Sequence, residues 1–546
     1  MEAHRIDLIA LGSTVPVKRS FGNSISTSFE TKSIISAVEG VIKDSVQGYV
    51  LFLQQGVQLD EKVIYDITHH EQPITVWYDD RVTNSFYVSR VIEYVSPGIY
   101  FNLKTSEEGF SIWNMSLQCL LVKKDLLKTV RFLDSRFVST KGALVEWLYR
   151  MLYSGVLIKR ERMMINPQFI HNGEMAMEDD LRFIQYQFGT KWFAWISMRY
   201  MLDGLISPSV SWNVFRKVRQ EKSIAEQTKM SYSHWKEINL NDEKYKISII
   251  IPTIERYSYL VTVLTQLKKQ SILPLEVIVI DQSAKVLRNP ELFKGYDDIG
   301  LQYFEMEKTG QCRSRNLGLM QCKGDYILFI DDDVEVKPDL LENHIKCLKY
   351  FNADVSCGVC DEVDAGPIPK EYTFIRHSDV FPTNNGMVKR SVLEKTGLFD
   401  MAFDHGQRAD GDLGARIYKS GARMILNPEI RVLHHRAPRG GLRKHNVRKM
   451  TYSSSRKYIT HFRIPHVTEM YLNKMHFSKR EQREYLIQTL LGLFSIRGSM
   501  SRKLMKIVYA FIMFPSILYK IRRRNRIANI MLRSFPQIPH LEGLKG

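Results

Sequence analysis

The sequence has only six cysteines among its 546 residues, and it has no long hydrophobic run close to its N-terminus. Six cysteines are too few for a disulfide framework in a chain of this length, so we expect reduced thiols and a cytosolic protein. Residues 1–13 lack the apolar core of a signal peptide. The longest apolar run, at residues 507–519, is too short to span a bilayer.

Common nucleotide and nucleic-acid motifs are also missing. The sequence contains neither of the glycine-rich phosphate loops G-x-x-x-x-G-K-[ST] and G-x-G-x-x-G, and it has no zinc-finger or RRM signature. We therefore expect no nucleic acid among its partners. The C-x-x-C formed by Cys357 and Cys360, with His344 and Cys347 upstream, leaves a zinc site as an alternative. Its place inside an apolar run favours buried thiols in a strand.

Acidic residues are scarce in the C-terminal part of the chain. Residues 431–546 hold 25 of the 77 Lys and Arg but only 4 of the 59 Asp and Glu, so this region carries +21 and residues 1–430 carry −3. Two apolar segments, at 485–496 and 504–519, precede a basic cluster at 520–526. This pattern is typical of a helix that attaches to an anionic membrane surface. The alternative is a helix packed on the protein with a solvated basic end.

A strand–helix–strand pattern begins near residue 246. Residues 247–251 (ISIII) form a continuous apolar run, as in a buried parallel strand. Apolar residues then recur at helical spacing in 260–267, and a second apolar run ends at Asp281. A third buried strand is predicted at 326–330 (YILFI). These alternations predict an α/β fold with a mostly parallel sheet, in which ligands bind beyond the carboxyl ends of the strands.

The run Asp331-Asp332-Asp333 directly follows the third of these strands. Carboxylate oxygens are the ligands that Mg²⁺ and Mn²⁺ prefer, and such ions leave positions free for substrate phosphates. A solvated acidic turn is the alternative. The strand context favours a metal site at this edge of the sheet.

Residues 407–416 (QRADGDLGAR) read as the start of a helix with Asp410 and Asp412 in its first turn. Aspartate is favourable there as a cap, and it is also a candidate general base, so spacing alone leaves both roles open. His434 and His435 follow as candidate metal ligands, and a Gly-Gly loop that carries Arg439 and Arg443 suits contact with phosphates.

An internal repeat is also visible. Residues 49–57 resemble 326–334, and six residues in 134–155 match residues in 400–421 without a gap. The first copy has Gln54-Gln55-Gly56 in place of the aspartate run, and Leu144 in place of Asp410. We therefore expect a duplicated domain whose first copy is non-catalytic and serves in packing or acceptor binding.

The motifs of residues 246–443 together resemble the inverting nucleotide-sugar glycosyltransferases of family 2, which have the GT-A fold. Residues 249–253 (IIIPT) look like the opening strand of that family. Asp281 sits where the family has an acidic residue that contacts the base or ribose. Residues 314–318 (SRNLG) are similar to the family's Ala-Arg-Asn-x-Gly, whose arginine lies near the nucleotide.

Two further motifs resemble those of the family, and the second of them matches only in part. Asp331-x-Asp333 matches the D-x-D motif, whose last aspartate usually holds the metal. Residues 409–413 (ADGDL) resemble the Glu-Asp-x-Asp-Leu motif that carries the catalytic base, which makes Asp410 the base candidate. The glutamate of that motif is Ala409 here, so the acceptor contacts of relatives do not carry over directly.

The resemblance implies the following site. The donor-binding residues are Pro252, Thr253, Glu255, Asp281, Arg315, Asp331, Asp332, Arg439 and Arg443. Asp333, Asp331, His434 and His435 are the candidate ligands of Mn²⁺ or Mg²⁺, Asp410 is the catalytic base, and Asp412 is an acceptor contact.

The sequence thus predicts a metal-dependent inverting glycosyltransferase that moves a sugar from a nucleotide-sugar donor to a glycan or lipid-linked acceptor in cell-surface polysaccharide synthesis. It would be cytoplasmic and peripheral on the inner face of the membrane. A nucleotidyltransferase and a non-catalytic scaffold or nucleotide-binding protein at the membrane are the alternatives. We expect a degenerate GT-A-like domain at 1–188, a helical linker at 189–244, a catalytic GT-A domain at 245–445 and a basic helical region at 446–546.

Overall fold

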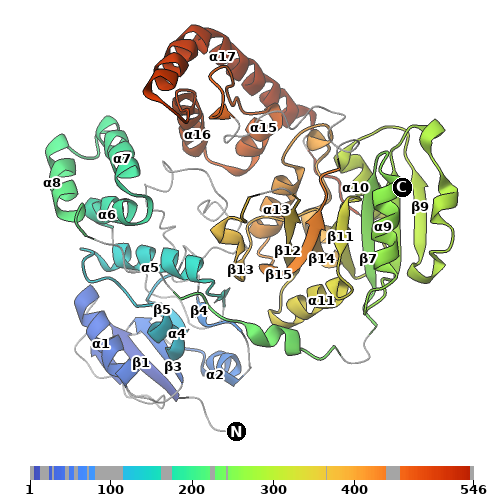
Figure 1. Ribbon diagram of the computed structural model, residues 1–546. Coiled ribbons are helices and arrows are strands. Elements are labelled where there is room, and N and C mark those ends of the chain that lie inside the picture. Colours follow the sequence, from blue (N-terminus) through green and yellow to red (C-terminus); the bar gives the residue numbers. More distant parts are fainter. Residues whose placement is uncertain are drawn as a thin grey trace. The chain divides into compact units, whose positions relative to one another are not determined.

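The computed structural model of the chain divides into two compact units, each described here by itself (Figure 1). The first holds the described residues as far as Tyr232, with Phe374–His377, and the second holds Ser233–Thr373 and the chain from Ser378 onward. The residues that the structure describes are 5–12, 24–27, 30–43, 48–54, 59–69, 73–79, 115–161, 175–221, 228–240, 244–363, 366–437, 455–535 and 537–541.

The first unit contains a mixed sheet with the strand order β2-β1-β3-β5-β4-β6 in its described part. β1 is parallel to β2 and β3, β5 is antiparallel to β3 and β4, and β4 is parallel to β6. The elements are β1 (Arg5–Leu11), β2 (Ser24–Thr27), α1 (Thr31–Lys43), β3 (Gly48–Gln54), α2 (Glu61–His69), β4 (Val76–Tyr78), β5 (Cys119–Lys123), α4 (Lys124–Thr129), α5 (Thr140–Ser154), β6 (Ile158–Arg160), α6 (Met177–Phe188), α7 (Thr190–Leu202), α8 (Pro208–Val218) and β13 (Arg376–His377).

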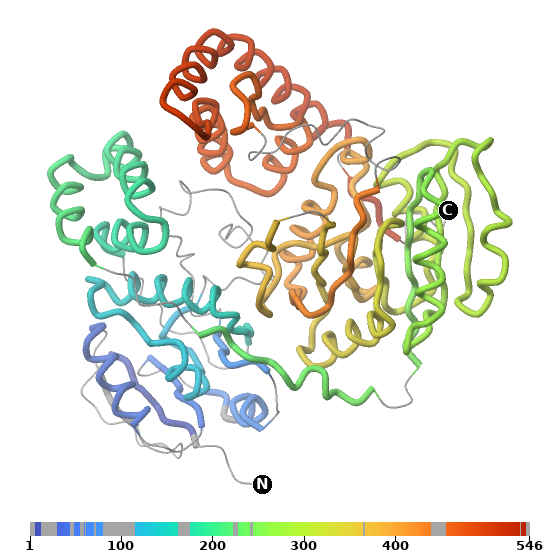
Figure 2. Tube along the Cα trace, in the orientation of Figure 1, coloured from blue at the N-terminus to red at the C-terminus, as the bar shows by residue number. Residues whose placement is uncertain are grey.

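The second unit contains a larger sheet, whose main path is β11-β15-β12-β14-β10-β7-β8-β9, and a C-terminal group of helices (Figure 2). The elements are β7 (Ile247–Thr253), α9 (Tyr257–Leu267), β8 (Glu276–Asp281), β9 (Leu301–Glu305), α10 (Gln311–Gln321), β10 (Tyr326–Ile330), β11 (Val334–Val336), α11 (Leu340–Tyr350), β12 (Val355–Glu362), β14 (Asn385–Lys389), α12 (Arg390–Thr396), α13 (Ala409–Lys419), β15 (Met424–His434), α15 (Val467–His476), α16 (Lys479–Gly492) and α17 (Met500–Ser534). Short 3₁₀ turns lie at 233–237, 285–287, 290–293, 297–299, 370–372 and 401–403.

The core of this sheet follows the predicted pattern. β7, β8 and β10 are parallel neighbours with almost fully buried side chains, as expected of strands covered on both faces. α9 buries Leu260, Val263, Leu264 and Leu267, the helical stripe read from the sequence. The α/β fold class, with helices around mostly parallel strands and a helical C-terminal region, is confirmed.

The two sheets share one strand order and one register. The order β2-β1-β3-β5-β4-β6 corresponds to β8-β7-β10-β14-β12-β15, which is extended by β9 and β11. β3 and β5 pair Tyr49 with Lys123, and β10 and β14 pair Tyr326 with Lys389.

The parallel pairs agree in the same way. β4 and β6 pair Val76 with Ile158, and β12 and β15 pair Val355 with Met424. The later strand of each pair lies 266 positions further along in the second unit, from 123 to 389 and from 158 to 424. The six-residue sequence match in 134–155 has this same offset.

The cysteines are free thiols, and all except the partly exposed Cys360 are buried. Cys357 and Cys360 lie in β12, whereas His344 of α11 hydrogen-bonds Ser356 and Asn385. Burial lowers the pKa of His344 to about 4, so this histidine is a neutral core residue. Within the described ranges, the residues that group as metal ligands lie elsewhere. The zinc alternative is therefore not supported.

The C-terminal apolar segments form helices, as expected, but the second is longer than its apolar run. α17 extends over 35 residues and includes the basic cluster. Among the described helices it alone has the length and composition to cross a membrane, with 22% of its most apolar window buried in the protein.

Candidate functional site

Most of the predicted site residues converge on one pocket in the second unit, beyond the carboxyl ends of β7 and β10. Its lining includes eight of them: Pro252, Thr253, Arg315, Asp331, Asp332, Asp333, Asp410 and His434. Arg256, Arg408 and Arg436 add positive charge to the same lining. Glu255, Asp281, Asp412 and His435 are not part of it, and Arg439 and Arg443 lie outside the described residues.

Sheet pairing brings the metal-ligand candidates together. β11 follows the aspartate run directly and pairs antiparallel with the end of β15, with Val334 opposite His434. Ligand atoms of Asp331, Asp333 and His434 consequently lie within 4.8 Å of one another. Two carboxylates and an imidazole suit Mn²⁺ or a similar divalent ion, so this donor set fits the predicted metal. His435 instead contacts Glu335, at 2.6 Å.

Asp333 is the best-held member of this cluster. It is 1% exposed, its Oδ2 accepts the N–H of Ala437, and its Oδ1 lies 3.1 Å from His434 Nε2. Burial opposes ionisation, but the hydrogen bond with His434 and the charge of Arg256 keep the pKa of Asp333 below its usual value. The hydrogen bond with Asp333 in turn raises the pKa of His434 to about 10. A divalent ion bound here would replace the proton shared by this pair.

Arg256 is a site residue that the sequence analysis missed. Its guanidinium lies 2.9 Å from Asp332 Oδ1 and 3.1 Å from Asp333 Oδ2. Thr253 donates its hydroxyl to Asp332 Oδ2 at 2.7 Å. Burial raises the pKa of Asp332 to about 6, although Arg256 opposes the shift. Asp332 therefore connects the end of β7 to the aspartate run. The only feature of the sequence that could have indicated Arg256 is its position just after β7.

Two other predicted donor residues have well-defined partners. Arg315 on α10 pairs with Asp331 at 3.2 Å. Asp281 is fully buried at the end of β8, where Tyr257 and Tyr303 donate hydroxyls to its Oδ2 at 2.6 Å and Ser283 N–H donates to its Oδ1. Burial and Asp281 raise the pKa of Tyr257 to about 12, so both tyrosines are neutral donors. A donor role for Asp281 remains a prediction.

Asp410 lies in the first turn of α13 and faces the pocket. The loop that precedes it is fixed by Asp404, whose Oδ1 accepts the N–H groups of Cys312 and Arg313 at the start of α10. Gly310 permits this approach, because a Cβ there would lie 2.2 Å from the Asp404 carboxylate. Asp404 is thus a second residue that the sequence analysis missed.

Asp412 has a different environment from Asp410. It is 0% exposed, Arg416 Nε donates to its Oδ2 at 2.9 Å, and His476 Nε2 lies 2.8 Å from its Oδ1. Burial opposes ionisation, but Arg416 and then His476 hold the pKa of Asp412 below its usual value. These contacts favour a structural role over the predicted acceptor contact.

Replacing Asp412 with asparagine should therefore lower the free energy of unfolding by about 3 kcal/mol at neutral pH, since it leaves the largely buried Arg416 without its counter-ion. The folded-state pKa lies below the unfolded value of 3.8, so the pair stabilises the fold above that pH and loses this effect as the pH falls further. Denaturant unfolding should show the gap between wild type and variant closing below about pH 4. An unchanged midpoint at pH 7 would contradict this assignment.

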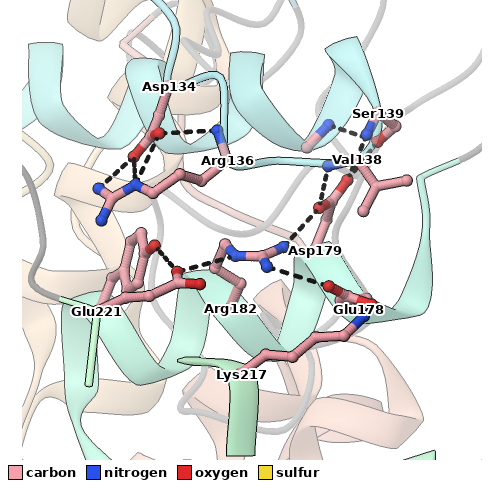
Figure 3. Close-up of polar contacts among 11 residues, drawn as sticks. Asp134, Arg136, Val138, Ser139, Glu178, Asp179, Arg182, Lys217 and Glu221 are labelled. Carbon is pink, nitrogen blue, oxygen red and sulfur yellow. Dashed lines mark hydrogen bonds and ion pairs between the residues drawn. The ribbon is translucent and has the colours of Figure 1, made fainter. Parts of the chain in front are cut away.

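In the corresponding corner of the first unit, side chains make a network of hydrogen bonds and ion pairs (Figure 3). Leu144, at the position that matches Asp410, is buried. Asp179 of α6 accepts the N–H groups of Val138 and Ser139, each at 2.8 Å, and the Ser139 hydroxyl at 2.7 Å. Arg182 joins Asp179 to Glu178 and Glu221. A carboxylate from the chain thus occupies the N-terminus of α5, where α13 of the second unit faces an open pocket.

Comparison with known proteins identifies the domain that carries this pocket. Residues 248–403 match glycosyl transferase family 2. The second unit therefore contains a family 2 glycosyltransferase domain. This match covers β7 through the 3₁₀ turn at 401–403 and ends just before Asp410.

Relatives of the glycosyltransferase domain include bacterial enzymes. A Campylobacter jejuni GalNAc(5)-diNAcBac-PP-undecaprenol beta-1,3-glucosyltransferase is 32% identical over 23% of this chain and 42% of its own. The Staphylococcus aureus poly(ribitol-phosphate) beta-N-acetylglucosaminyltransferase TarS is 26% identical over 20% of each chain. The chain spans less than two thirds of the length of such relatives.

Among solved structures, the Pyrobaculum calidifontis mannosyltransferase PcManGT in complex with GDP-Man and Mn²⁺ is similar at 16% identity, with a TM-score of 0.33. That similarity covers 54% of this chain and 91% of PcManGT.

Proposed function

We propose that the protein is an inverting glycosyltransferase, which moves a sugar from a nucleotide-sugar donor to a hydroxyl of a glycan or lipid-linked acceptor. The observation that carries the proposal is the joint presence of Asp331, Asp333, His434 and Asp410 in one pocket of the family 2 domain. The pocket lining thus combines candidate ligands for a divalent ion with a carboxylate suited to remove a proton.

In the proposed reaction, Asp410 accepts the proton of the acceptor hydroxyl as that oxygen attacks the anomeric carbon. The bond from that carbon to the diphosphate breaks in the same displacement, so the configuration at the carbon inverts. In this proposal Arg315 and Arg436, which line the pocket, bind the departing diphosphate. A Mn²⁺ or Mg²⁺ ion held by Asp331, Asp333 and His434 would neutralise negative charge on that diphosphate.

Nucleotide binding tests the donor half of this proposal. The full chain should gain a few degrees in melting temperature with UDP or GDP at about 100 times the dissociation constant, and only when Mn²⁺ or Mg²⁺ is present. Thermal melting with UDP, GDP, CDP and ADP, each with Mn²⁺, with Mg²⁺ and without either ion, measures this. If no nucleotide raises the melting temperature with either ion, the donor assignment is wrong.

The names of the relatives support an acceptor at the cell surface. One of them acts on poly(ribitol phosphate) and another on an undecaprenol-linked glycan. We therefore place the protein in the synthesis of a cell-surface polysaccharide at the cytoplasmic face of the membrane.

The exposed face of α17 supports attachment to an anionic bilayer surface. Leu504, Val508, Ile512 and Tyr519 follow one another at helical spacing and are 58–68% exposed. Exposed Arg522 and Arg526 continue this face at three and seven residues past Tyr519. The side chains that α17 buries, including Ala510, Ile517 and Ile521, lie on its opposite side. Apolar residues followed by arginines on one free face fit an interfacial helix bound to anionic lipid.

Charge reversal on this face gives a direct test. Arg526→Glu should weaken binding of the full chain to phosphatidylglycerol-containing vesicles by about 30-fold, since each basic residue at such a surface contributes about 1 kcal/mol and the reversal changes the charge by two units. Lys520→Glu makes the same change in charge on a different face of α17 and should weaken binding less. Vesicle co-sedimentation measures both. Equal losses for the two variants, or no binding by the wild type, would contradict attachment through this face.

We further propose that the first unit is a non-catalytic copy of the glycosyltransferase domain. The shared strand order and register support a common origin. Leu144 and the capped N-terminus of α5 support the loss of its catalysis.

A further inference from the structure

Helix α15, which lies beyond the family 2 match, contacts the segment that leads into the catalytic helix α13. Thr468 Oγ1 accepts the N–H of Gln407 at 3.0 Å. Its neighbour Glu469 pairs with Arg408 at 3.5 Å and with Arg463 at 2.6 Å. Arg408 immediately precedes α13 and has a φ of +77°, a conformation that costs energy for a residue with a Cβ. Contacts from α15 therefore hold the turn two residues before Asp410.

Two buried hydrogen bonds fix the flanks of this segment. Tyr471, 0% exposed, donates its hydroxyl to Asp400 Oδ2 at 2.8 Å, and its ring packs on Phe403 at 5.3 Å. Five residues further along α15, His476 Nε2 lies 2.8 Å from Asp412 Oδ1. Lys419 donates to the carbonyl of the same histidine at 2.9 Å.

The Asp412 carboxylate joins α15 to the body of the domain. Its partner Arg416 donates through Nη1 to the carbonyls of Thr396 and Gly397 and through Nη2 to that of Leu398. These carbonyls lie at the end of α12. The chain His476–Asp412–Arg416 therefore runs from α15, through the first turn of α13, to backbone that α12 holds in place.

The first unit has a corresponding ion pair and backbone contacts, but a different residue donates to the carboxylate. Glu146 pairs with Arg150, and Arg150 donates to the carbonyls of Arg131 and Phe132, which match those of Gly397 and Leu398 by the 266-residue offset. Gln187 Nε2 donates to Glu146 Oε1 at 3.2 Å, where the second unit has His476. A neutral N–H donor on a following helix is thus sufficient for this contact in the same fold.

We infer that His476 and Tyr471 are positioning residues for Asp410: by holding Asp412 and Asp400, they set the place of the catalytic carboxylate in the pocket. This inference rests on the proposed function, because it assumes that Asp410 acts in transfer. His476 and Tyr471 do not line the donor pocket, so their loss affects the orientation of the base and leaves nucleotide binding intact. A shift of about 1 Å in a catalytic group lowers turnover by about 100-fold.

The test compares two substitutions of His476 in the full chain. His476→Leu removes the donor to Asp412 and should lower kcat for nucleoside diphosphate release by at least about tenfold, with the KM for the donor within about twofold of wild type. His476→Gln keeps an N–H donor, as Gln187 does in the first unit, and should restore kcat to within about threefold. The probes are UDP-GlcNAc, UDP-glucose and GDP-mannose with Mn²⁺. The donor with the fastest turnover by wild type is used for all variants.

Tyr471→Phe keeps the ring contact with Phe403 but loses the bond to Asp400, so it should also lower kcat without changing the KM. If His476→Leu fails to fold, Tyr471→Phe provides the test in its place. Lys474→Leu, a change on the same helix at a partly exposed position, is the control and should retain wild-type kcat. Wild-type kcat in a folded His476→Leu or Tyr471→Phe variant would overturn the inference, as would a loss in His476→Gln equal to that in His476→Leu. Wild-type protein that releases no nucleoside diphosphate would refute the proposed function itself.

Discussion

Asp410→Asn should lower kcat for sugar transfer by about 100-fold to 10,000-fold, the range expected when a general base is removed. Asparagine keeps the size of the side chain and still accepts the N–H of Gly411, as Asp410 does at 2.9 Å. The first turn of α13 should therefore retain its geometry. What is lost is the capacity to take the proton of the acceptor hydroxyl as it attacks the sugar.

Nucleotide binding separates this effect from damage to the pocket. The UDP- or GDP-dependent rise in melting temperature should be the same in Asp410→Asn as in wild type, because the residue faces the acceptor side of the proposed reaction. Asp297→Asn, at an exposed carboxylate away from the pocket, is the matched control and should keep full turnover. If Asp410→Asn transfers sugar at the wild-type rate from a good donor, another group is the base.

Asp333→Asn should remove metal-dependent nucleotide binding and lower kcat/KM by at least about 100-fold. Asp333 is 1% exposed and lies against both Arg256 and His434. Neutralising it takes away an anionic ligand and leaves two cationic groups without their common partner. Isothermal titration of the variant with Mn²⁺ and UDP should show no coupling between the two ligands.

A matched change elsewhere tests whether the effect belongs to the cluster. Asp339→Asn alters an exposed aspartate that follows β11 in the same unit and should leave the Mn²⁺ dependence unchanged. Chelation of wild type with EDTA should reproduce the Asp333→Asn phenotype and be reversed by added Mn²⁺. An Asp333→Asn protein with wild-type affinity for UDP in the presence of Mn²⁺ would contradict the assigned ligand set.

Local patterns were sufficient to predict the central strands and the acidic edge. β7, β8 and β10 are continuous apolar runs, and the aspartate run follows one of them directly, so strand burial and the edge rule for α/β sheets located the site. Asp410 could be predicted as a candidate because its motif is local and linear, and it lies in the lining of the same pocket. His434 could be proposed only as one of two adjacent histidines, and the pairing of β11 with β15 distinguishes it from His435.

Contacts between segments that are distant in the sequence could not be predicted from local patterns. Arg256 meets Asp332 because β7 and β10 are neighbours in the sheet, and nothing in the sequence around Arg256 indicates that pairing. Spacing left Asp412 open between a cap and a general base, and the resemblance implied an acceptor contact. Its partner His476 is 64 residues away, in a region whose sequence indicated only basic helices. Periodicity carries no information on such pairings.

The internal repeat contains both matching and differing residues, and the two groups have different surroundings in the structure. Six matching side chains in each copy suggested duplication, and Glu146–Arg150 and Asp412–Arg416 among them make the same buried ion pair in the two units. The two units thus share an ion pair at matching positions, whereas Leu144 stands at the position of Asp410, the proposed base.

The most direct test of the account is the release of nucleoside diphosphate by the full chain from UDP-GlcNAc, UDP-glucose and GDP-mannose, measured with and without Mn²⁺. We predict release from at least one of these donors that requires the ion and falls by about 100-fold or more in Asp410→Asn. Release that is independent of metal and unaffected by Asp410→Asn, or no release from any donor under conditions where nucleotide binds, would contradict the assignment of this pocket as a glycosyltransferase site.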